Sequence, residues 1–124
     1  MKAAVLREVR KPLVIEDVQI NKPGPHEVLI RTSAAGICHS DLHFVEGLYP
    51  YPLPAVLGHE SAGVVEQVGS EVRTVQPGDH VITCLSAFCG HCEHCLTGFM
   101  SRCVSPDTKR QKGDAPRITA TAGG

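Results

Sequence analysis

Residues 89–103 of the chain read CGHCEHCLTGFMSRC, and this stretch decides how the surrounding segment must fold. Its cysteines, Cys89, Cys92, Cys95 and Cys103, are spaced C-x2-C-x2-C-x7-C. Zinc prefers four nitrogen or sulfur ligands at the corners of a tetrahedron, with each sulfur about 2.3 Å from the ion. Thiols two residues apart can reach one ion from a tight turn, and a fourth closes the shell. Four thiolates leave no position for water, so the spacing predicts a structural zinc site.

The chain has six cysteines, which also allows a small secreted disulfide domain as an alternative. Three of them are too closely spaced for that framework, and residues 1–10 lack the apolar core of a signal peptide. We therefore expect a reduced, cytoplasmic protein. Cys84 has no assigned partner and is expected to be an ordinary thiol. His91 and His94 could compete for zinc, but the four thiols already complete the shell.

Length and composition bound the other possibilities. The 124 residues are 42% hydrophobic and 20% charged, which suits one globular domain over residues 1–124. A formal net charge of −1 gives no strong field for nucleic acid or an anionic membrane, so neither is expected as a partner. The basic run at 109–112 is interpreted as a solvated loop. No apolar run approaches the ~18 residues that would span a bilayer.

Short apolar runs separated by proline and glycine turns predict a mostly β domain, in the form of a barrel. One short helix is expected over residues 40–45, capped by Ser40 or Asp41. Residues 84–106 are expected to be a loop lobe folded around metal, and the tail 107–124 is expected to be poorly ordered. The expected strands cover residues 3–6, 13–18, 27–31, 64–68 and 80–83.

A second group of possible metal ligands lies upstream, at Cys38, His59 and Glu60. Taken alone, Cys38 is better interpreted as a small buried residue than as a ligand, and His59 as a hydrogen-bonded core histidine. A thiolate and an imidazole with an open coordination position would instead form a catalytic zinc site. The neighbouring motifs favour the catalytic interpretation.

Four segments, in chain order, resemble the N-terminal, GroES-like catalytic domain of medium-chain zinc alcohol dehydrogenases. The resemblance covers residues 1–119 and implies a partly open β-barrel with short helices and a zinc-bound lobe. The matching segments are 36–43 (GICHSDLH), 58–63 (GHESAG) with Gly69 and Val72, 77–81 (PGDHV) and the cysteines of 89–103.

The resemblance implies that Cys38 and His59 bind the catalytic zinc, which acts as a Lewis acid and lowers the pKa of an alcohol substrate. Glu60 would lie near the metal, either as a direct ligand or as a partner of the ligands. Asp41 would orient His59 and fix its tautomer, although a carboxylate at a helix start is the simpler alternative.

Three further residues acquire roles through the resemblance. Ser40 would take the substrate proton, because a hydroxyl can both accept and donate. His43 would form the far end of that relay, reached through the cofactor ribose, and His39 would meet the cofactor pyrophosphate. The alternatives are a helix cap for Ser40 and a surface histidine for His43.

The sequence departs from the family in lacking a dinucleotide-binding fingerprint, since no G-x-G-x-x-G follows a strand. A Rossmann domain needs roughly ~150 further residues, and the family's third fixed zinc ligand, a cysteine, lies beyond the equivalent of Gly124. We therefore expect the chain to be a fragment that does not turn over alcohol by itself.

The implied function is oxidation of a primary alcohol to an aldehyde with hydride transfer to NAD. A formaldehyde dehydrogenase that acts on a thiol adduct is an alternative within the family, and a polyol dehydrogenase is a less favoured one. Tyr49, Tyr51 and Leu53 are candidate residues for distinguishing between substrates. Expected partners are a small alcohol or aldehyde and, in the full-length enzyme, further copies of the same chain. Outside the family, the alternative is a non-catalytic zinc-stabilised module or an inactive truncated remnant. A nucleic-acid-binding zinc finger is disfavoured because no basic recognition helix follows the cysteines.

Overall fold

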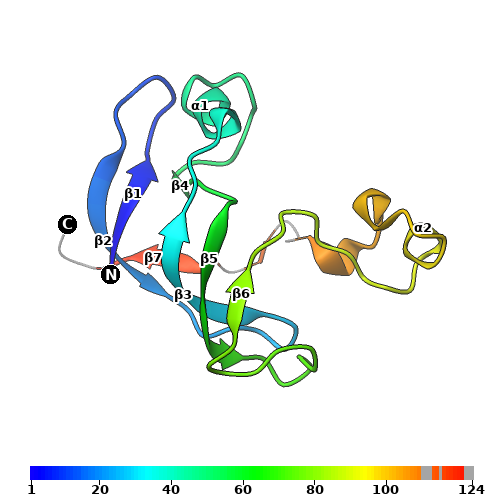
Figure 1. Cartoon of the computed structure of the whole chain (residues 1–124). Helices are drawn as coiled ribbons and strands as arrows, with labels where there is room; N and C mark the ends of the chain where they lie inside the picture. Colours follow the sequence, from blue (N-terminus) through cyan, green and yellow to red (C-terminus); the bar gives the residue numbers. More distant parts are fainter. Residues whose placement is uncertain (110–112, 115, 122–124) are drawn as a thin grey trace. The chain divides into compact units, whose positions relative to one another are not determined.

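The computed structural model describes residues 1–109, 113–114 and 116–121. The chain divides into two compact units, one formed by Met1–Thr83 with Arg117–Gly124 and the other by Cys84–Pro116 (Figure 1). None of the helices in the described segments is long and apolar enough to cross a membrane.

The first unit is built mainly from β-strands. Its single described helix, α1, covers His39–Val45 and lies between the third and fourth strands in sequence. The strands are β1 (Lys2–Leu6), β2 (Val14–Ile20), β3 (Val28–Ala35), β4 (Ala55–Val56), β5 (Ser61–Val68), β6 (His80–Ile82) and β7 (Ile118–Ala120).

These strands form two sheets, of order β4-β1-β2-β7 and β3-β5-β6, and every pairing among the described residues is antiparallel. The strands curl rather than lying flat, as Figure 1 shows for β2, β3 and β5. Curling follows from the right-handed twist of each strand and is the first step toward a closed barrel. The predicted mostly β, partly open barrel is therefore confirmed, and no doubly wound parallel sheet occurs in the described part of the chain.

A small apolar core lies under the four-stranded sheet. Side chains two residues apart in a strand share a face, and Ala3 and Val5 of β1 pack with Val18 of β2 and with Ile118 of β7. Val5 and Val18 are only 5% and 2% exposed. Fully burying a valine stabilises a fold by about 1.5–3 kcal/mol, so the β1–β2 pair provides much of this core.

Arg10 in the turn between β1 and β2 fixes the end of α1. Its backbone is in the left-handed region, with φ of 62°. Its backbone N–H donates to the Val45 carbonyl at 2.6 Å, and its Nε donates to the Glu46 carbonyl at 3.3 Å. The last carbonyls of a helix have no partner within the helix, so Arg10 satisfies two groups at the carboxyl end of α1.

Two expectations from the sequence were wrong in detail. Residues 118–120 form β7, which pairs with β2, whereas a poorly ordered tail was expected for 107–124. β3 continues to Ala35, beyond the expected end at residue 31, because residues up to Ala35 pair with β5. Residues 110–112, 115 and 122–124 of the expected tail lie outside the described residues.

The second unit contains three short helical turns and no described strand. They are α2 (Glu93–Leu96), η1 (Met100–Arg102) and η2 (Pro106–Thr108). Its exposed apolar side chains include Leu85, Leu96 and Val104, each at least 69% exposed, whereas Cys103 is buried. The centre of this unit is therefore its cysteine cluster and not an apolar core. The sequence predicted this arrangement for the lobe.

Candidate active site and metal centres

Pairing between β3 and β5 brings the two ligand segments together. Ala35 at the end of β3 pairs with Ser61 at the start of β5, and the Gly36 N–H donates to the Glu60 carbonyl at 2.9 Å. Cys38 follows β3 by three residues, and His59 precedes β5 by two. The antiparallel pair therefore places both residues at the same edge of the sheet.

Cys38 is the N-cap of α1, with an extended backbone. Asp41, at the third helical position, accepts a hydrogen bond from the Cys38 N–H through Oδ2 at 3.0 Å. A carboxylate at this position accepts a hydrogen bond from one of the unpaired N–H groups at the start of the helix. Its negative charge is also stabilised by the positive end of the helix dipole. The sequence placed Ser40 or Asp41 at the cap, which was wrong by two or three residues.

His59 is presented by Gly58, whose φ of +126° is rarely adopted by residues with a side chain. His59 Nδ1 lies 3.3 Å from Asp41 Oδ1, and its Nε2 lies 3.9 Å from Glu60 Oε1. A carboxylate at one ring nitrogen fixes the tautomer and leaves the other nitrogen for a metal. Asp41 is therefore placed to orient His59, as the resemblance implied.

Cys38, His59 and Glu60 form one group of candidate ligands, since one ligand atom from each lies within 4.8 Å of the others. The pKa of the Cys38 thiol is lowered, first by hydrogen bonds from Ser40 and then by His59, while burial opposes the shift. The pKa of His59 is raised, mainly by its hydrogen bond with Cys38. A thiolate beside an imidazole is the donor set that zinc accepts, so these residues fit the metal.

Three more side chains of interest lie on α1. Ser40 lies two residues after Cys38, and its side chain helps to lower the pKa of the Cys38 thiol. The ring of His43 meets the edge of the His39 ring at 4.8 Å and that of Tyr49 at 5.2 Å, measured between centroids. Its Nδ1 is buried and has no hydrogen-bond partner among the described residues, and Glu46 Oε2 lies 4.0 Å away. A buried ring nitrogen of this kind is suited to a partner that the chain itself does not supply.

The four cysteines of the lobe also come together, with the ligand atoms of all four within 4.8 Å of one another. The Cys92 sulfur lies 3.5 Å from that of Cys95 and 3.9 Å from that of Cys103, and Cys89 and Cys95 are 3.9 Å apart. Sulfurs at the corners of a tetrahedron with arms of about 2.3 Å are about 3.8 Å apart. The spacing of the thiols therefore fits a four-thiolate zinc site.

The surroundings of three of the four lobe thiols lower their pKa values. Backbone hydrogen bonds lower the pKa values of Cys89, Cys92 and Cys103, the largest coming from His91, Cys95 and Ser105 respectively. Burial raises the pKa of the Cys95 thiol to about 11. Because a thiol must lose its proton to bind zinc, zinc affinity at this cluster is expected to depend on pH.

Comparison with known proteins agrees with this arrangement. The family model for the alcohol dehydrogenase GroES-like domain matches residues 24–124. The chain belongs to this family. Within it, the chain is 51% identical over 102 residues to a geraniol dehydrogenase of Castellaniella defragrans and 48% identical over 101 residues to a putative alcohol dehydrogenase D of Mycobacterium tuberculosis. Each alignment covers 82% of the chain but 27% of the relative, so the chain spans about a quarter of their length.

Solved structures of the family show the same fold. An alcohol dehydrogenase zinc-binding domain protein from Burkholderia ambifaria matches with a TM-score of 0.80 and 40% identity, over 98% of this chain and 34% of that one. An NAD-dependent alcohol dehydrogenase matches with a TM-score of 0.72 and 35% identity, over 97% of this chain and 33% of that one. The predicted GroES-like fold is confirmed.

The remaining residues considered in the sequence that the structure describes belong to neither ligand group. Cys84 is exposed and is not a member of either ligand group. His91 points its Nδ1 at the Cys89 carbonyl, 3.0 Å away, so that nitrogen is engaged within the loop. Of the basic run, Arg110 and Lys112 lie outside the described residues.

Two features of the GroES-like domain were missed in the sequence. Asp41 contacts both ligand residues, Cys38 and His59, whereas only the His59 contact was anticipated. Tyr49 contacts His43, although it was considered only for substrate discrimination. The contact between the His43 and Tyr49 rings cannot be predicted from a local sequence pattern, because it depends on the path of residues 46–49 after the helix.

Proposed function

We propose that this chain is the zinc-binding catalytic domain of an NAD-dependent alcohol dehydrogenase that oxidises a primary alcohol to its aldehyde. The observation that supports this most directly is the joint arrangement of Cys38, His59 and Glu60, with Asp41 behind the histidine. A domain that used zinc only for stability would need the four lobe cysteines and none of these residues.

Cys38 and His59 would hold the catalytic zinc, and Glu60 is close enough to join them. Bound zinc supplies a Lewis acid that makes an alcohol easier to deprotonate. Asp41 holds the His59 ring, and Ser40 helps to lower the pKa of the Cys38 thiol. Cys89, Cys92, Cys95 and Cys103 would hold a second zinc that stabilises the lobe.

Ser40 is proposed to accept the proton of the substrate hydroxyl, since it lies beside Cys38 at the start of α1. His43, one turn later on the same helix, is proposed to pass that proton toward water by way of the ribose of NAD. His43 Nδ1 has no hydrogen-bond partner among the described residues and lies 4.0 Å from Glu46 Oε2. This supports the role, because an imidazole nitrogen can accept or donate a proton. NAD supplies the hydride acceptor, and His39 is proposed to meet its pyrophosphate.

The geraniol dehydrogenase relative, at 51% identity, supports a primary alcohol as the substrate class. The first test measures NADH formation from primary alcohols by the whole protein that contains this chain. Removing a proton-transfer group typically costs about 10²–10⁴-fold in rate, so we expect Ser40→Ala to lower kcat by at least about 100-fold with zinc content unchanged. Ser101→Ala, at an exposed serine of the lobe, is the matched control.

Full activity in Ser40→Ala would overturn the proposed role of that hydroxyl. If the wild-type protein reduced no NAD and its zinc content were unaffected by Cys38→Ser, the alternative of a non-catalytic zinc-stabilised module would replace the proposal.

A further inference from the structure

Arg10 has a backbone conformation that its residue type rarely adopts. Its φ is 62°, and among the described residues it is the one non-glycine residue with a positive φ. A left-handed backbone brings the Cβ of an L-residue close to the following carbonyl oxygen, so glycine adopts it at a much lower cost than arginine. A strained residue persists only where surrounding contacts hold it in place. The contacts of Arg10 therefore indicate what the strained conformation is used for.

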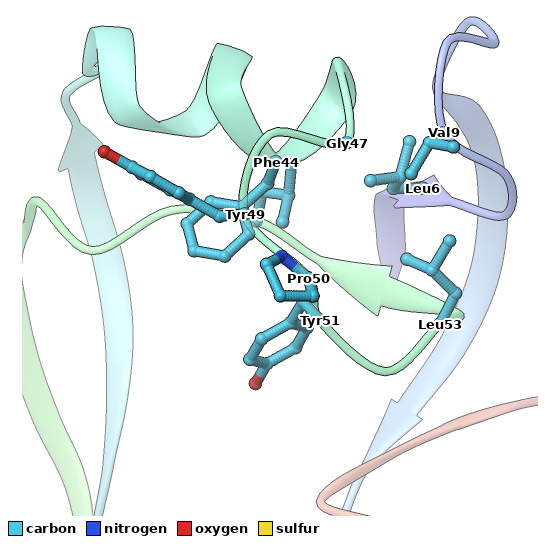
Figure 2. A pocket seen from close by; sticks show the side chains of 9 residues that line it. Leu6, Val9, Phe44, Gly47, Tyr49, Pro50, Tyr51 and Leu53 are labelled. Atoms are coloured by element: carbon cyan, nitrogen blue, oxygen red, sulfur yellow. The ribbon is translucent and has the colours of Figure 1, made fainter.

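Two hydrogen bonds tie Arg10 to the carboxyl end of α1. Its backbone N–H donates to the Val45 carbonyl at 2.6 Å, and its Nε donates to the Glu46 carbonyl at 3.3 Å. The preceding Val9 lies against the residue that follows the helix, since a Cβ built on Gly47 would be 3.3 Å from the Val9 Cβ and Cγ1. Figure 2 shows Val9 in the turn and Gly47 after the helix. The turn between β1 and β2 therefore holds this end of α1.

Packing alone does not fix the carboxyl end of α1 against the turn. A pocket of about 190 Å³ lies beside this half of the helix, and Val9, Phe44 and Gly47 are among the residues that line it (Figure 2). At about 30 Å³ per water molecule, that volume equals roughly six waters. Side chains beside such a space lack close contacts on that side. The hydrogen bonds from Arg10 therefore bear more of the positioning than they would in a filled core.

The same end of α1 determines the surroundings of His43. Glu46 Oε2 lies 4.0 Å from His43 Nδ1, and the Leu48 N–H donates to the His43 carbonyl at 2.9 Å. The ring of Tyr49, the next residue, meets the His43 ring at 5.2 Å between centroids. Glu46 is thus bound to Arg10 through its carbonyl and faces His43 through its carboxylate. A shift of this end of α1 would move both neighbours of the His43 ring.

We propose that Arg10 is a positioning residue for proton transfer, because its hydrogen bond to the Glu46 carbonyl holds the surroundings of the His43 ring in place. The inference rests on the proposed function, which gives His43 the last step of the proton path. Arg10 is exposed and belongs to neither ligand group, so it acts through Glu46 and not on the substrate. It follows that glycine at position 10 should give a stable protein in which proton transfer is slow.

The first test measures kcat, KM and melting temperature for Arg10→Gly in the whole protein that contains this chain. Glycine relieves the left-handed backbone, so the melting temperature should stay the same or rise. A misplacement of about 1 Å can cost about 100-fold in rate, so we expect kcat for a primary alcohol to fall about 10-fold. KM should change less than about twofold. Arg10→Lys keeps a donor for the Glu46 carbonyl and should restore most of kcat. Lys11→Ala, at the exposed neighbouring cation, is the matched control.

A double-mutant cycle shows whether Arg10 acts through His43. In a His43→Ala background, Arg10→Gly should change kcat by less than about twofold, because the ring that it positions is absent. An equal loss of kcat in both backgrounds would overturn the proposal, as would wild-type kcat in Arg10→Gly alone. If Arg10→Gly does not fold, Arg10→Asn takes its place in the cycle, since asparagine tolerates a left-handed backbone and lacks the guanidinium group.

A further test needs no turnover, so it separates failure of this inference from failure of the proposed function. Diethyl pyrocarbonate modifies accessible imidazole rings, and peptide mass spectrometry measures the rate at each histidine. The exposed His26 and His80 serve as internal references. We expect Arg10→Gly to raise the rate at His43 several-fold over these references, because the ring and its buried Nδ1 become accessible. Lys11→Ala should leave that rate unchanged. An unchanged rate at His43 in Arg10→Gly would overturn the proposal even if the protein oxidises alcohols.

Discussion

Asp41 contacts both proposed ligands of the catalytic metal: one carboxylate oxygen lies 3.3 Å from His59 Nδ1, and the other accepts the Cys38 N–H at 3.0 Å. One side chain thus couples the start of α1 to the segment before β5. Cys38 follows β3 and His59 precedes β5, and these two strands pair with each other. Strand pairing and Asp41 therefore both hold the two proposed ligands near one another.

Asp41→Asn should weaken metal binding at the Cys38–His59 site without unfolding the helix. Asparagine can still accept the Cys38 N–H bond, but it removes the negative charge beside His59. Loss of a partner of this kind typically costs 10–100-fold in metal affinity. Zinc titration against a competing chelator measures the change, and Glu46→Gln on the same helix controls for loss of a carboxylate. Unchanged affinity in Asp41→Asn would show that Asp41 only caps the helix.

Gly69→Ala should destabilise the fold. Gly69 is buried, and its N–H donates to the Glu27 carbonyl at 2.8 Å. An added Cβ would overlap the backbone carbonyls of Gly24 and Pro25, which cannot move aside as a side chain would. Overpacking costs about 1–3 kcal/mol, and chemical denaturation measures it. Ser70→Ala, at the exposed next position, should change the free energy of unfolding little. Wild-type stability in Gly69→Ala would show that this turn can shift.

The motifs on which the interpretation rests are local in the sequence, and this is why the sequence alone could predict the two groups of metal ligands. Cys89, Cys92 and Cys95 lie within seven residues, so their spacing alone indicates a shared ligand sphere. His59 and Gly58 are adjacent, and the positive φ of Gly58 explains why the motif begins with glycine. That residues Ile118–Ala120 form the strand β7 could not be predicted in this way. The segment is short and is stabilised by pairing with β2, which is far away in the sequence.

The helix cap shows the same limit. Ser40 and Asp41 are both good N-cap residues, but the end of β3 and the Gly36–Glu60 hydrogen bond make the chain enter the helix at Cys38. The pocket beside α1 (Figure 2) also depends on distant contacts, since Leu6 and Val9 come from the β1 end while Phe44 comes from α1. The sequence analysis selected Tyr49, Tyr51 and Leu53 but could not identify Leu6 and Val9 as further residues that line the pocket.

The stability of the chain should depend on pH through Glu16. Its pKa is lowered, first by the hydrogen bonds from Arg7, which has Nε 2.7 Å from Oε1 and Nη2 2.5 Å from Oε2. A carboxyl group whose pKa is lower in the folded state contributes stability at pH values above its ordinary pKa of 4.5. That contribution is lost as pH falls through the lowered value, because the unfolded chain then binds more protons.

Glu16→Gln should therefore be less stable than wild type at neutral pH, and the difference should shrink as the solution becomes acidic. Denaturation midpoints measured across that range report it, with Glu8→Gln, an exposed carboxylate of the same hairpin, as the control. A difference between Glu16→Gln and wild type that stays constant with pH would contradict the assignment to the Arg7–Glu16 pair.

The most direct test of the account is the zinc content of the purified chain, measured by elemental analysis alongside Cys103→Ser and Cys84→Ser. The lobe's four thiols should hold about one zinc per chain. Cys103→Ser should lose that zinc, and Cys84→Ser should keep it because Cys84 lies outside the cluster. A value near two for the wild-type chain would mean that Cys38, His59 and Glu60 also retain metal. A value near zero, or equal zinc in Cys103→Ser and wild type, would contradict the four-thiolate site and the account built on it.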